Sequence, residues 1–176
     1  MERVLERRRE PEPAEQPYDL QRKRDDDMCR RRADGTVVIK GKDLEWHQSR
    51  QSLAKFYLWE GNWDKLGAPP WRVFIHDIKT HSGSHRHQGG LAILVLRGKG
   101  YTVVEGVRHD WEQGDCVLLP IIPGGVEHQH FNLDPANPAL WLALIYTPMA
   151  DEVNIGMAQV SEHPDWSGTK RGKKNG

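Results

Sequence analysis

The chain has 176 residues, a length that fits one domain and excludes two large catalytic domains. Lys+Arg and Asp+Glu both number 25, so the net charge is zero and no overall field attracts nucleic acid or an anionic membrane. The hydrophobic fraction is 37%, below the usual value of about 45–50%. We therefore expect polar terminal segments around a concentrated core.

The two ends of the chain are polar. Residues 1–35 are rich in Arg, Glu, Asp and Pro, and such a segment buries too little apolar surface to offset the entropy of ordering. We expect a disordered or loosely docked charged arm there and a C-terminal tail over residues 151–176. The charged amino terminus does not resemble a secretory signal, and the apolar run Ala139–Tyr146 is too short to cross a membrane. Because the chain has only two cysteines, we do not expect a disulfide framework. We expect a cytoplasmic location.

Between these ends, turn residues separate short apolar segments. Thr36–Ile39 indicates a short strand, and Leu44–Trp59 has apolar spacing that fits a helix or irregular cover. Residues 36–70 are thus a cover segment. From residue 71 onward the apolar runs are Trp71–Ile78, Leu91–Arg97, Tyr101–Val104, Cys116–Leu119, Val126–Phe131 and Leu140–Tyr146. So many closely spaced strands predict an all-β fold, a small antiparallel barrel or sandwich over residues 71–150.

Four tryptophans lie at the start of this strand-rich region: Trp46, Trp59, Trp63 and Trp71. Large aromatic side chains of this kind either line a pocket or seal a core or a subunit contact. The cover segment is therefore a candidate contact with a second copy of the chain.

Histidines gather in two short segments. The chain has nine histidines, and five of them lie in these segments: His81, His85, His87, His128 and His130. Residues two apart on a strand point to the same face, so each His-x-His pair presents both imidazoles together. Neutral imidazole binds iron, nickel, copper and zinc, and two facing strands can surround such an ion. The pattern therefore predicts a metal site.

The same two segments carry a resemblance to a known family. They contain His85-Arg86-His87 with Gly98, and Pro123-Gly124-Gly125 with His128 and Asn132. In order and spacing these residues resemble the two motifs of the cupins, over about residues 71–147. The resemblance implies a single cupin barrel, which is a double-stranded β-helix or jelly roll.

Leu91 stands where most cupins place a glutamate ligand. With an apolar residue at this position the chain resembles the gentisate dioxygenases. The resemblance implies Fe2+ held by three histidines, here His85, His87 and His128. Mn, Ni, Cu and Zn suit the same ligands. Three neutral ligands leave the metal its full charge, which favours chelation of an anionic oxygen substrate and activation of O2.

His130 matches a histidine that lies beside the metal in that group. It is the candidate catalytic residue, as a proton acceptor or as a hydrogen-bond partner of bound oxygen, with a fourth ligand or a wall residue as alternatives. Arg72 and His76 share one face of the strand Trp71–Ile78 and are candidates for holding an anionic group of the substrate. Leu91 is expected to keep one flank of the metal dry.

Three functions follow from these observations. The leading hypothesis is a cupin-type non-haem iron(II) dioxygenase that cleaves a C–C bond in a hydroxylated aromatic or an enolisable diketone, as in the catabolism of aromatic compounds. Its partners are a small-molecule substrate and O2, with no nucleic acid and no membrane. The alternatives are a metal-dependent lyase or isomerase that needs no oxygen and a non-catalytic small-molecule-binding cupin. The resemblance also implies a homodimer.

Overall fold

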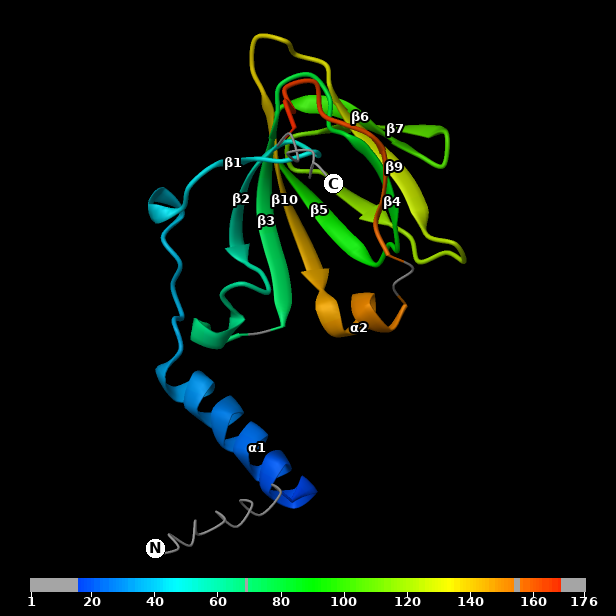
Figure 1. Ribbon diagram of the computed structural model, residues 1–176. Coiled ribbons are helices and arrows are strands. Elements are labelled where there is room, and N and C mark those ends of the chain that lie inside the picture. Colours follow the sequence, from blue (N-terminus) through cyan, green and yellow to red (C-terminus); the bar gives the residue numbers. More distant parts are fainter. Residues whose placement is uncertain (1–15, 69, 154–155, 169–176) are drawn as a thin grey trace, which may run out of the picture.

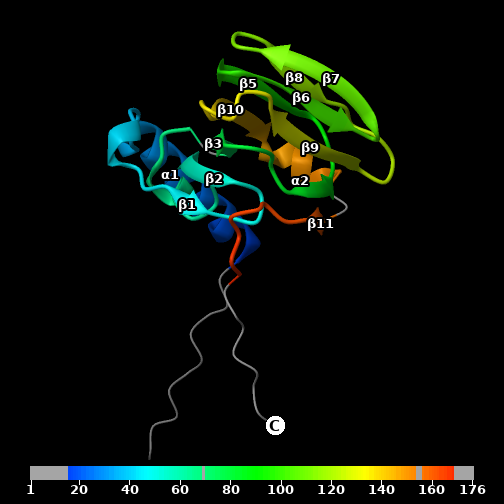
Figure 2. The same cartoon turned by 90° about the horizontal axis from the view of Figure 1, so that it is seen from above.

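Two antiparallel β-sheets face each other and form a jelly-roll barrel (Figures 1 and 2). The computed structural model describes residues 16–68, 70–153 and 156–168. One sheet has six strands in the order β1-β2-β3-β10-β5-β8, and the other has five in the order β11-β4-β9-β6-β7. The all-β jelly roll expected from the sequence is confirmed.

The strands of the six-stranded sheet are β1 (His47–Gln48), β2 (Leu53–Leu58), β3 (Trp71–Ile78), β10 (Ala139–Tyr146), β5 (Leu91–Arg97) and β8 (Cys116–Leu119). Those of the five-stranded sheet are β11 (Ala158–Ser161), β4 (Ser84–His87), β9 (Val126–Asn132), β6 (Lys99–Val104) and β7 (Val107–Glu112). The helices are α1 (Pro17–Asp34) and α2 (Thr147–Glu152), with short 3-10 turns η1 (Gly41–Asp43) and η2 (Trp63–Lys65). Strands β3, β5 and β8 have the boundaries predicted from their apolar runs.

Alternate side chains fill the space between the sheets. In β10 the buried positions are every second residue, from Ala139 to Ile145. Such alternation is expected where successive side chains point to opposite faces. The main core cluster contains Ile78, Leu91, Ile93, Leu119, Val126, Trp141, Ala143 and Ile145. Because residues from both sheets contribute, burial of this cluster holds the two sheets together.

The chain passes from one sheet to the other directly after His87. A Cβ atom on Gly89 would lie 1.8 Å from the carbonyl oxygen of Pro120, and Gly90 has a φ of +80°. Only glycine allows both this approach and this backbone conformation without strain. The Gly89–Gly90 pair thus fixes the end of β4 and, with it, the position of His87.

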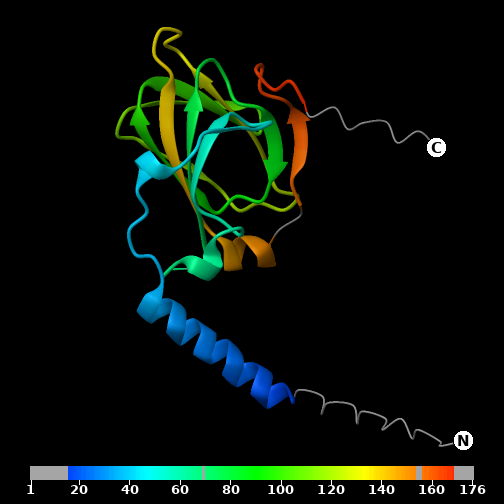
Figure 3. The ribbon, with the colours of Figure 1, turned by 60° about the vertical axis from the view of Figure 1, so that its left-hand side comes forward.

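Residues 17–34, expected to belong to a disordered or loosely docked charged arm, have regular structure. They form α1, which extends away from the barrel (Figures 1 and 3) and buries none of its side chains. Pro17 occupies its first turn, and Leu, Arg, Lys and Gln are good helix formers. Local propensity was therefore underestimated because polar composition was taken to mean disorder. Residues 1–15 of the expected arm lie outside the described residues.

The cover segment also departs from the expectation. Thr36–Ile39 is not a strand, since Thr36 makes only an isolated bridge with Leu66 and Val37 is exposed. Within Leu44–Trp59, expected to be helix or irregular, the chain forms β1 and β2, and β2 pairs with β3. Apolar residues occur on both faces of β2, which concealed its strand periodicity.

The C-terminal segment is part of the sheet structure and not a simple tail. Helix α2 follows β10, and β11 adds an edge strand to β4, with Gln159 opposite His85 (Figure 3). Strand β7 was also missed. Both strands are mostly exposed. β7 is mainly polar and β11 has only four residues, so neither stands out as an apolar run. Residues 169–176 lie outside the described part, and within that part no helix has the length and apolar character needed to cross a membrane.

Candidate metal centre

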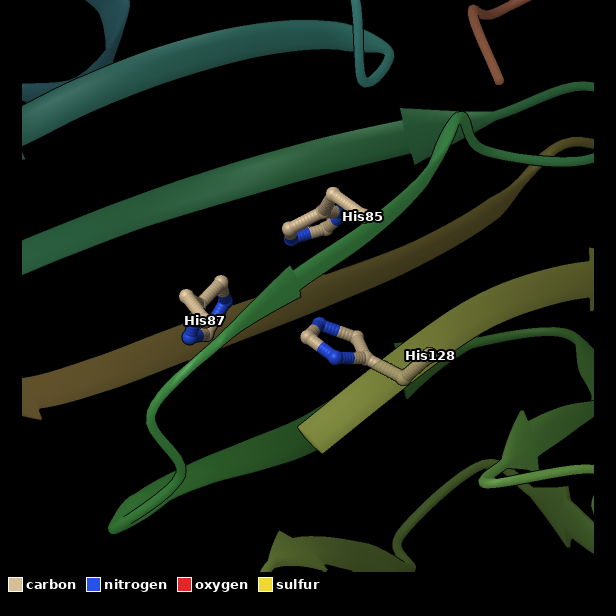
Figure 4. Close-up of side chains that lie close together, drawn as sticks. All are labelled: His85, His87 and His128. Atoms are coloured by element: carbon tan, nitrogen blue, oxygen red, sulfur yellow. The ribbon is translucent and has the colours of Figure 1, made fainter. Parts of the chain in front are cut away.

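Three histidines from two paired strands meet inside the barrel (Figure 4). His85 on β4 lies opposite His128 on β9, and His87 is two residues further along β4. One nitrogen of each ring lies within 4.8 Å of those of the other two, and the centroids of the His85 and His128 rings are 4.3 Å apart. The cluster can bind a metal ion, because three imidazoles at this separation can turn toward a common centre.

Backbone carbonyl groups orient two of these rings. Nδ1 of His87 lies 2.5 Å from the carbonyl oxygen of Gln88, and Nδ1 of His128 lies 3.2 Å from that of Val126. A carbonyl oxygen only accepts, so Nδ1 carries the hydrogen in both rings and Nε2 keeps its lone pair. Metal-bound histidines are typically held in this way, with the second nitrogen donating to a carbonyl or a carboxylate. The tautomers therefore suit a metal.

Burial keeps the three imidazoles neutral. His85 and His128 are 8% and 3% exposed. Burial, together with the charge of the neighbouring imidazoles, lowers the pKa of His85 to about 2 and that of His128 to about 4. Burial also lowers the pKa of His87. Neutral imidazole is the form that binds metals, so the protein holds this cluster ready for a metal at physiological pH.

The metal-free protein should lose stability as the pH falls below about 6.5, the pKa of an unfolded histidine. In that range the unfolded chain binds more protons than the folded one, because burial depresses the pKa of His76, His85 and His128. We expect the melting temperature of metal-free protein to change little between pH 7.5 and pH 7 and to fall from about pH 6.5 to pH 5. A constant or rising melting temperature over this range would contradict the burial of neutral histidines.

His130 lies beside the three-histidine cluster and is not a member of it. Its ring centroid is 5.5 Å from that of His128, and it is 2% exposed. Nδ1 of His130 lies 2.8 Å from Oγ1 of Thr102, which also accepts a hydrogen bond from Nε1 of Trp111 at 2.9 Å. Burial holds the pKa of His130 well below its usual range, so this ring too is neutral.

The hydrogen-bond chain defines which nitrogen of His130 carries the hydrogen. The indole of Trp111 can only donate, and Thr102 has no other hydroxyl hydrogen bond among the described residues than the one with Nδ1 of His130. Donation from Thr102 to Nδ1 is therefore the arrangement that leaves no buried hydroxyl hydrogen without an acceptor. Nδ1 is then an acceptor and Nε2 carries the hydrogen. This assignment favours a hydrogen-bond donor over a proton acceptor, two roles between which the sequence could not decide.

A cavity of about 420 Å³ borders His85 and His87. Its wall is mainly apolar and contains Phe56, Phe74, Leu91, Ile145, Ala150 and Met157. A second cavity of about 40 Å³ is lined by His128, His130 and Trp141 among others. The larger cavity has the size and apolar lining typical of small-molecule sites.

Arg72 and His76, the candidates for holding a substrate, and Leu91, expected beside the metal, all line the larger cavity. Leu91 is buried and lines both cavities, so no carboxylate reaches the cluster from its position. His76 is packed against Phe74 and Trp141, and burial lowers its pKa to about 3. It is therefore neutral and cannot attract an anion by charge. Arg72 is already paired with Glu60.

Other cavity residues were missed from the sequence. Gln51 precedes β2, Asp151 lies on α2, and Met157 precedes β11. They come from three distant segments that only the fold brings together, and no local pattern marks them. Gln88 directly follows the first histidine pair, which was the one available signal. Its side chain bonds the backbone of Gly89 and Ile122 and so supports the turn after β4.

Known proteins share the domain and the fold of this chain. Residues 74–145 match the cupin domain family. The structure is similar to the polyketide cyclase RemF from Streptomyces resistomycificus, with a TM-score of 0.54 and 14% identity over 74% of this chain and 89% of that chain. It is also similar to a Cupin 2 conserved barrel domain protein from Salinispora arenicola, with a TM-score of 0.50 and 20% identity over 67% of this chain and 94% of that chain.

A third similar structure is Pac13 from Streptomyces, a nucleoside dehydratase, with a TM-score of 0.50 and 9% identity over 72% of this chain and 92% of that chain. A search of curated protein sequences found no match. At these identities the structural likeness establishes the fold alone. The chain has the cupin fold, and residues 74–145 match the cupin domain. The finer resemblance to gentisate dioxygenases stays a prediction.

Proposed function

We propose that the protein is a metal-dependent cupin enzyme that uses Fe2+ and O2 to cleave a C–C bond in a hydroxylated aromatic or an enolisable diketone. One observation carries the proposal. Three neutral histidines, two of them oriented by carbonyl groups, form one cluster, and two of its members, His85 and His87, line a mainly apolar cavity of about 420 Å³. An open three-ligand site next to a substrate-sized cavity is typical of catalytic metals, whereas structural metal sites are usually closed by four protein ligands.

His85, His87 and His128 would hold the metal, and Leu91 adds no charge to this ligand set. When bound, Fe2+ would supply a Lewis acid for the substrate oxygens and the capacity to activate O2. The apolar wall excludes water and orients the substrate by its shape. His130 acts through its Nε2 hydrogen, which stabilises negative charge on a substrate oxygen as a phenolate or enolate develops.

A second candidate, a lyase or isomerase without O2, is favoured by a specific feature. A neutral histidine that donates a hydrogen bond beside a metal suits stabilisation of an enolate without any redox change. RemF, a cyclase, and Pac13, a dehydratase, have the same fold. A proton relay in such a reaction would need a further group, since Nδ1 of His130 is occupied by Thr102.

The two candidates are separated by oxygen consumption. Metal-free protein is reloaded with Fe2+ or Zn2+ and incubated with gentisate, catechol or acetylacetone, in air and without oxygen. We expect substrate loss matched by O2 uptake, only with Fe2+ and only in air. Turnover without oxygen, or equal turnover with Zn2+, would favour the lyase or isomerase. Binding of these compounds without turnover under any condition would favour the non-catalytic cupin.

We also propose that the protein forms a homodimer through the cover segment. Trp46 and Trp59 are exposed there, Trp71 is exposed directly after it at the start of β3, and aromatic side chains are enriched at subunit contacts. Light scattering coupled to size exclusion is expected to give twice the mass of one chain. The mass of a single chain would contradict this assembly.

A further inference from the structure

The one guanidinium in the wall of the larger cavity, among the described residues, is already paired. Arg72 on β3 lies with its Nε 3.3 Å from Oε2 of Glu60, and its terminal nitrogen contacts the other carboxylate oxygen. Both oxygens of Glu60, in the turn after β2, are therefore engaged. Such two-point pairing of guanidinium and carboxylate is the strongest form of this contact. Arg72 is thus not a free cation for a substrate.

A second carboxylate lies on the same cavity. Asp151 on α2 lines it together with Arg72. Burial lowers the pKa of Arg72, and the attraction of Asp151 raises it, so the two groups interact across the cavity wall. One guanidinium therefore faces two carboxylates. The local charge is negative, and His76, on the same face of β3, is neutral and cannot offset it.

The two carboxylates restrict which ligands can enter the cavity. A carboxylate or sulfonate on the body of a ligand would have to displace Glu60 from Arg72 or remain near unpaired negative charge. Either course costs binding energy, because like charges repel, and the cost is moderate since the side chain of Glu60 is 46% exposed to water. An uncharged apolar body meets only the wall formed by Phe56, Phe74, Leu91, Ile145 and Met157.

We propose that Glu60 and Asp151 make this cavity selective for substrates whose body is apolar and uncharged, and that Glu60 prevents Arg72 from binding anions. The inference rests on the proposed function only in taking the larger cavity as the substrate site. It reverses the expectation that Arg72 holds an anionic group. Oxygen donors of the substrate would then be confined to the end next to the histidine cluster.

Two fluorescent probes test this selectivity in full-length, metal-free protein. N-phenyl-1-naphthylamine and 1-anilinonaphthalene-8-sulfonate share one ring system and differ by a sulfonate. We expect the wild type to bind the neutral probe at least about 10-fold more tightly, the effect of one unfavourable charge contact. Glu60→Gln should tighten sulfonate binding by about 10-fold and leave the neutral probe within about 2-fold.

Two further variants assign the effect to Arg72. The gain in sulfonate binding should disappear in the double variant Glu60→Gln, Arg72→Met. Asp110→Asn is the matched control, because it removes the carboxylate from the exposed Arg108–Asp110 pair on β7 and should leave both affinities unchanged. Circular dichroism verifies that each variant is folded.

Equal wild-type affinity for the two probes would overturn the proposal. So would a Glu60→Gln variant that gains affinity for both probes alike, or no binding of the neutral probe at all. No metal and no turnover enter these titrations. A protein that fails to bind metal or to react would refute the proposed function and leave the measured selectivity intact.

Discussion

Replacing His85, His87 or His128 with alanine is expected to weaken metal binding by more than about 100-fold, which exceeds the usual cost of losing a residue that only supports a ligand. Each ring supplies one of three nitrogens within 4.8 Å of one another, and no carboxylate completes the cluster in the described residues. Loss of one imidazole therefore leaves two ligands. Calorimetric titration of metal-free variants with Zn2+ or Co2+ measures the change.

The matched control is His109→Ala, which removes an exposed histidine on β7. It should bind metal like the wild type. Wild-type affinity in any of the three ligand variants would reject the assignment for that residue. Equal weakening in His109→Ala would show that the titration reports unspecific binding.

Replacing His130 with alanine should slow turnover on the order of 100-fold, as the loss of one preorganised hydrogen-bond donor does elsewhere. Metal affinity should stay within a few-fold of the wild type, because His130 lies outside the three-histidine cluster. His130→Gln retains an N–H donor and should recover part of the lost rate. Thr102→Val removes the partner of Nδ1 and should cause a smaller loss through misorientation of the ring.

These variants separate the roles considered for His130. Complete loss of metal in His130→Ala would make it a fourth ligand. Unchanged turnover would make it a wall residue. If His130→Gln is as slow as His130→Ala, while the wild-type rate rises with pH through a single ionisation, a proton acceptor would replace the donor role inferred from Thr102.

Much of the barrel could be predicted because its central strands have clear local signals. The runs that became β3, β5 and β8 are apolar, bounded by Gly, Pro or charged residues, and buried on at least one face. Strand parity placed the two histidine pairs on common faces, and the pairing of β4 with β9 brings them together. The metal cluster could therefore be predicted from two pairs of histidines in which the members are two residues apart.

The remaining parts depend on contacts between distant segments. Strand β11 is short and mostly exposed, and it is held by pairing with β4 and by the hydrogen bond from Nε2 of Gln51 to Oε1 of Gln159 at 2.6 Å. Parity placed Arg72 on a cavity-facing position but gave no sign of Glu60, which comes from the turn after β2. The tautomer of His130 depends on Thr102 and Trp111, which lie on β6 and β7. Local sequence does not contain such information.

Metal content of the wild-type protein tests the three-histidine centre most directly. The protein is purified without added metal, analysed for elements, stripped with a chelator, reloaded with Fe2+ under nitrogen and analysed again beside His85→Ala. We expect about one transition-metal ion per wild-type chain after reloading, and little in the variant, because each ligand contributes a large share of the binding energy. Less than about one-tenth of an ion per wild-type chain both before and after reloading, with the protein folded, would contradict a metal centre at these histidines.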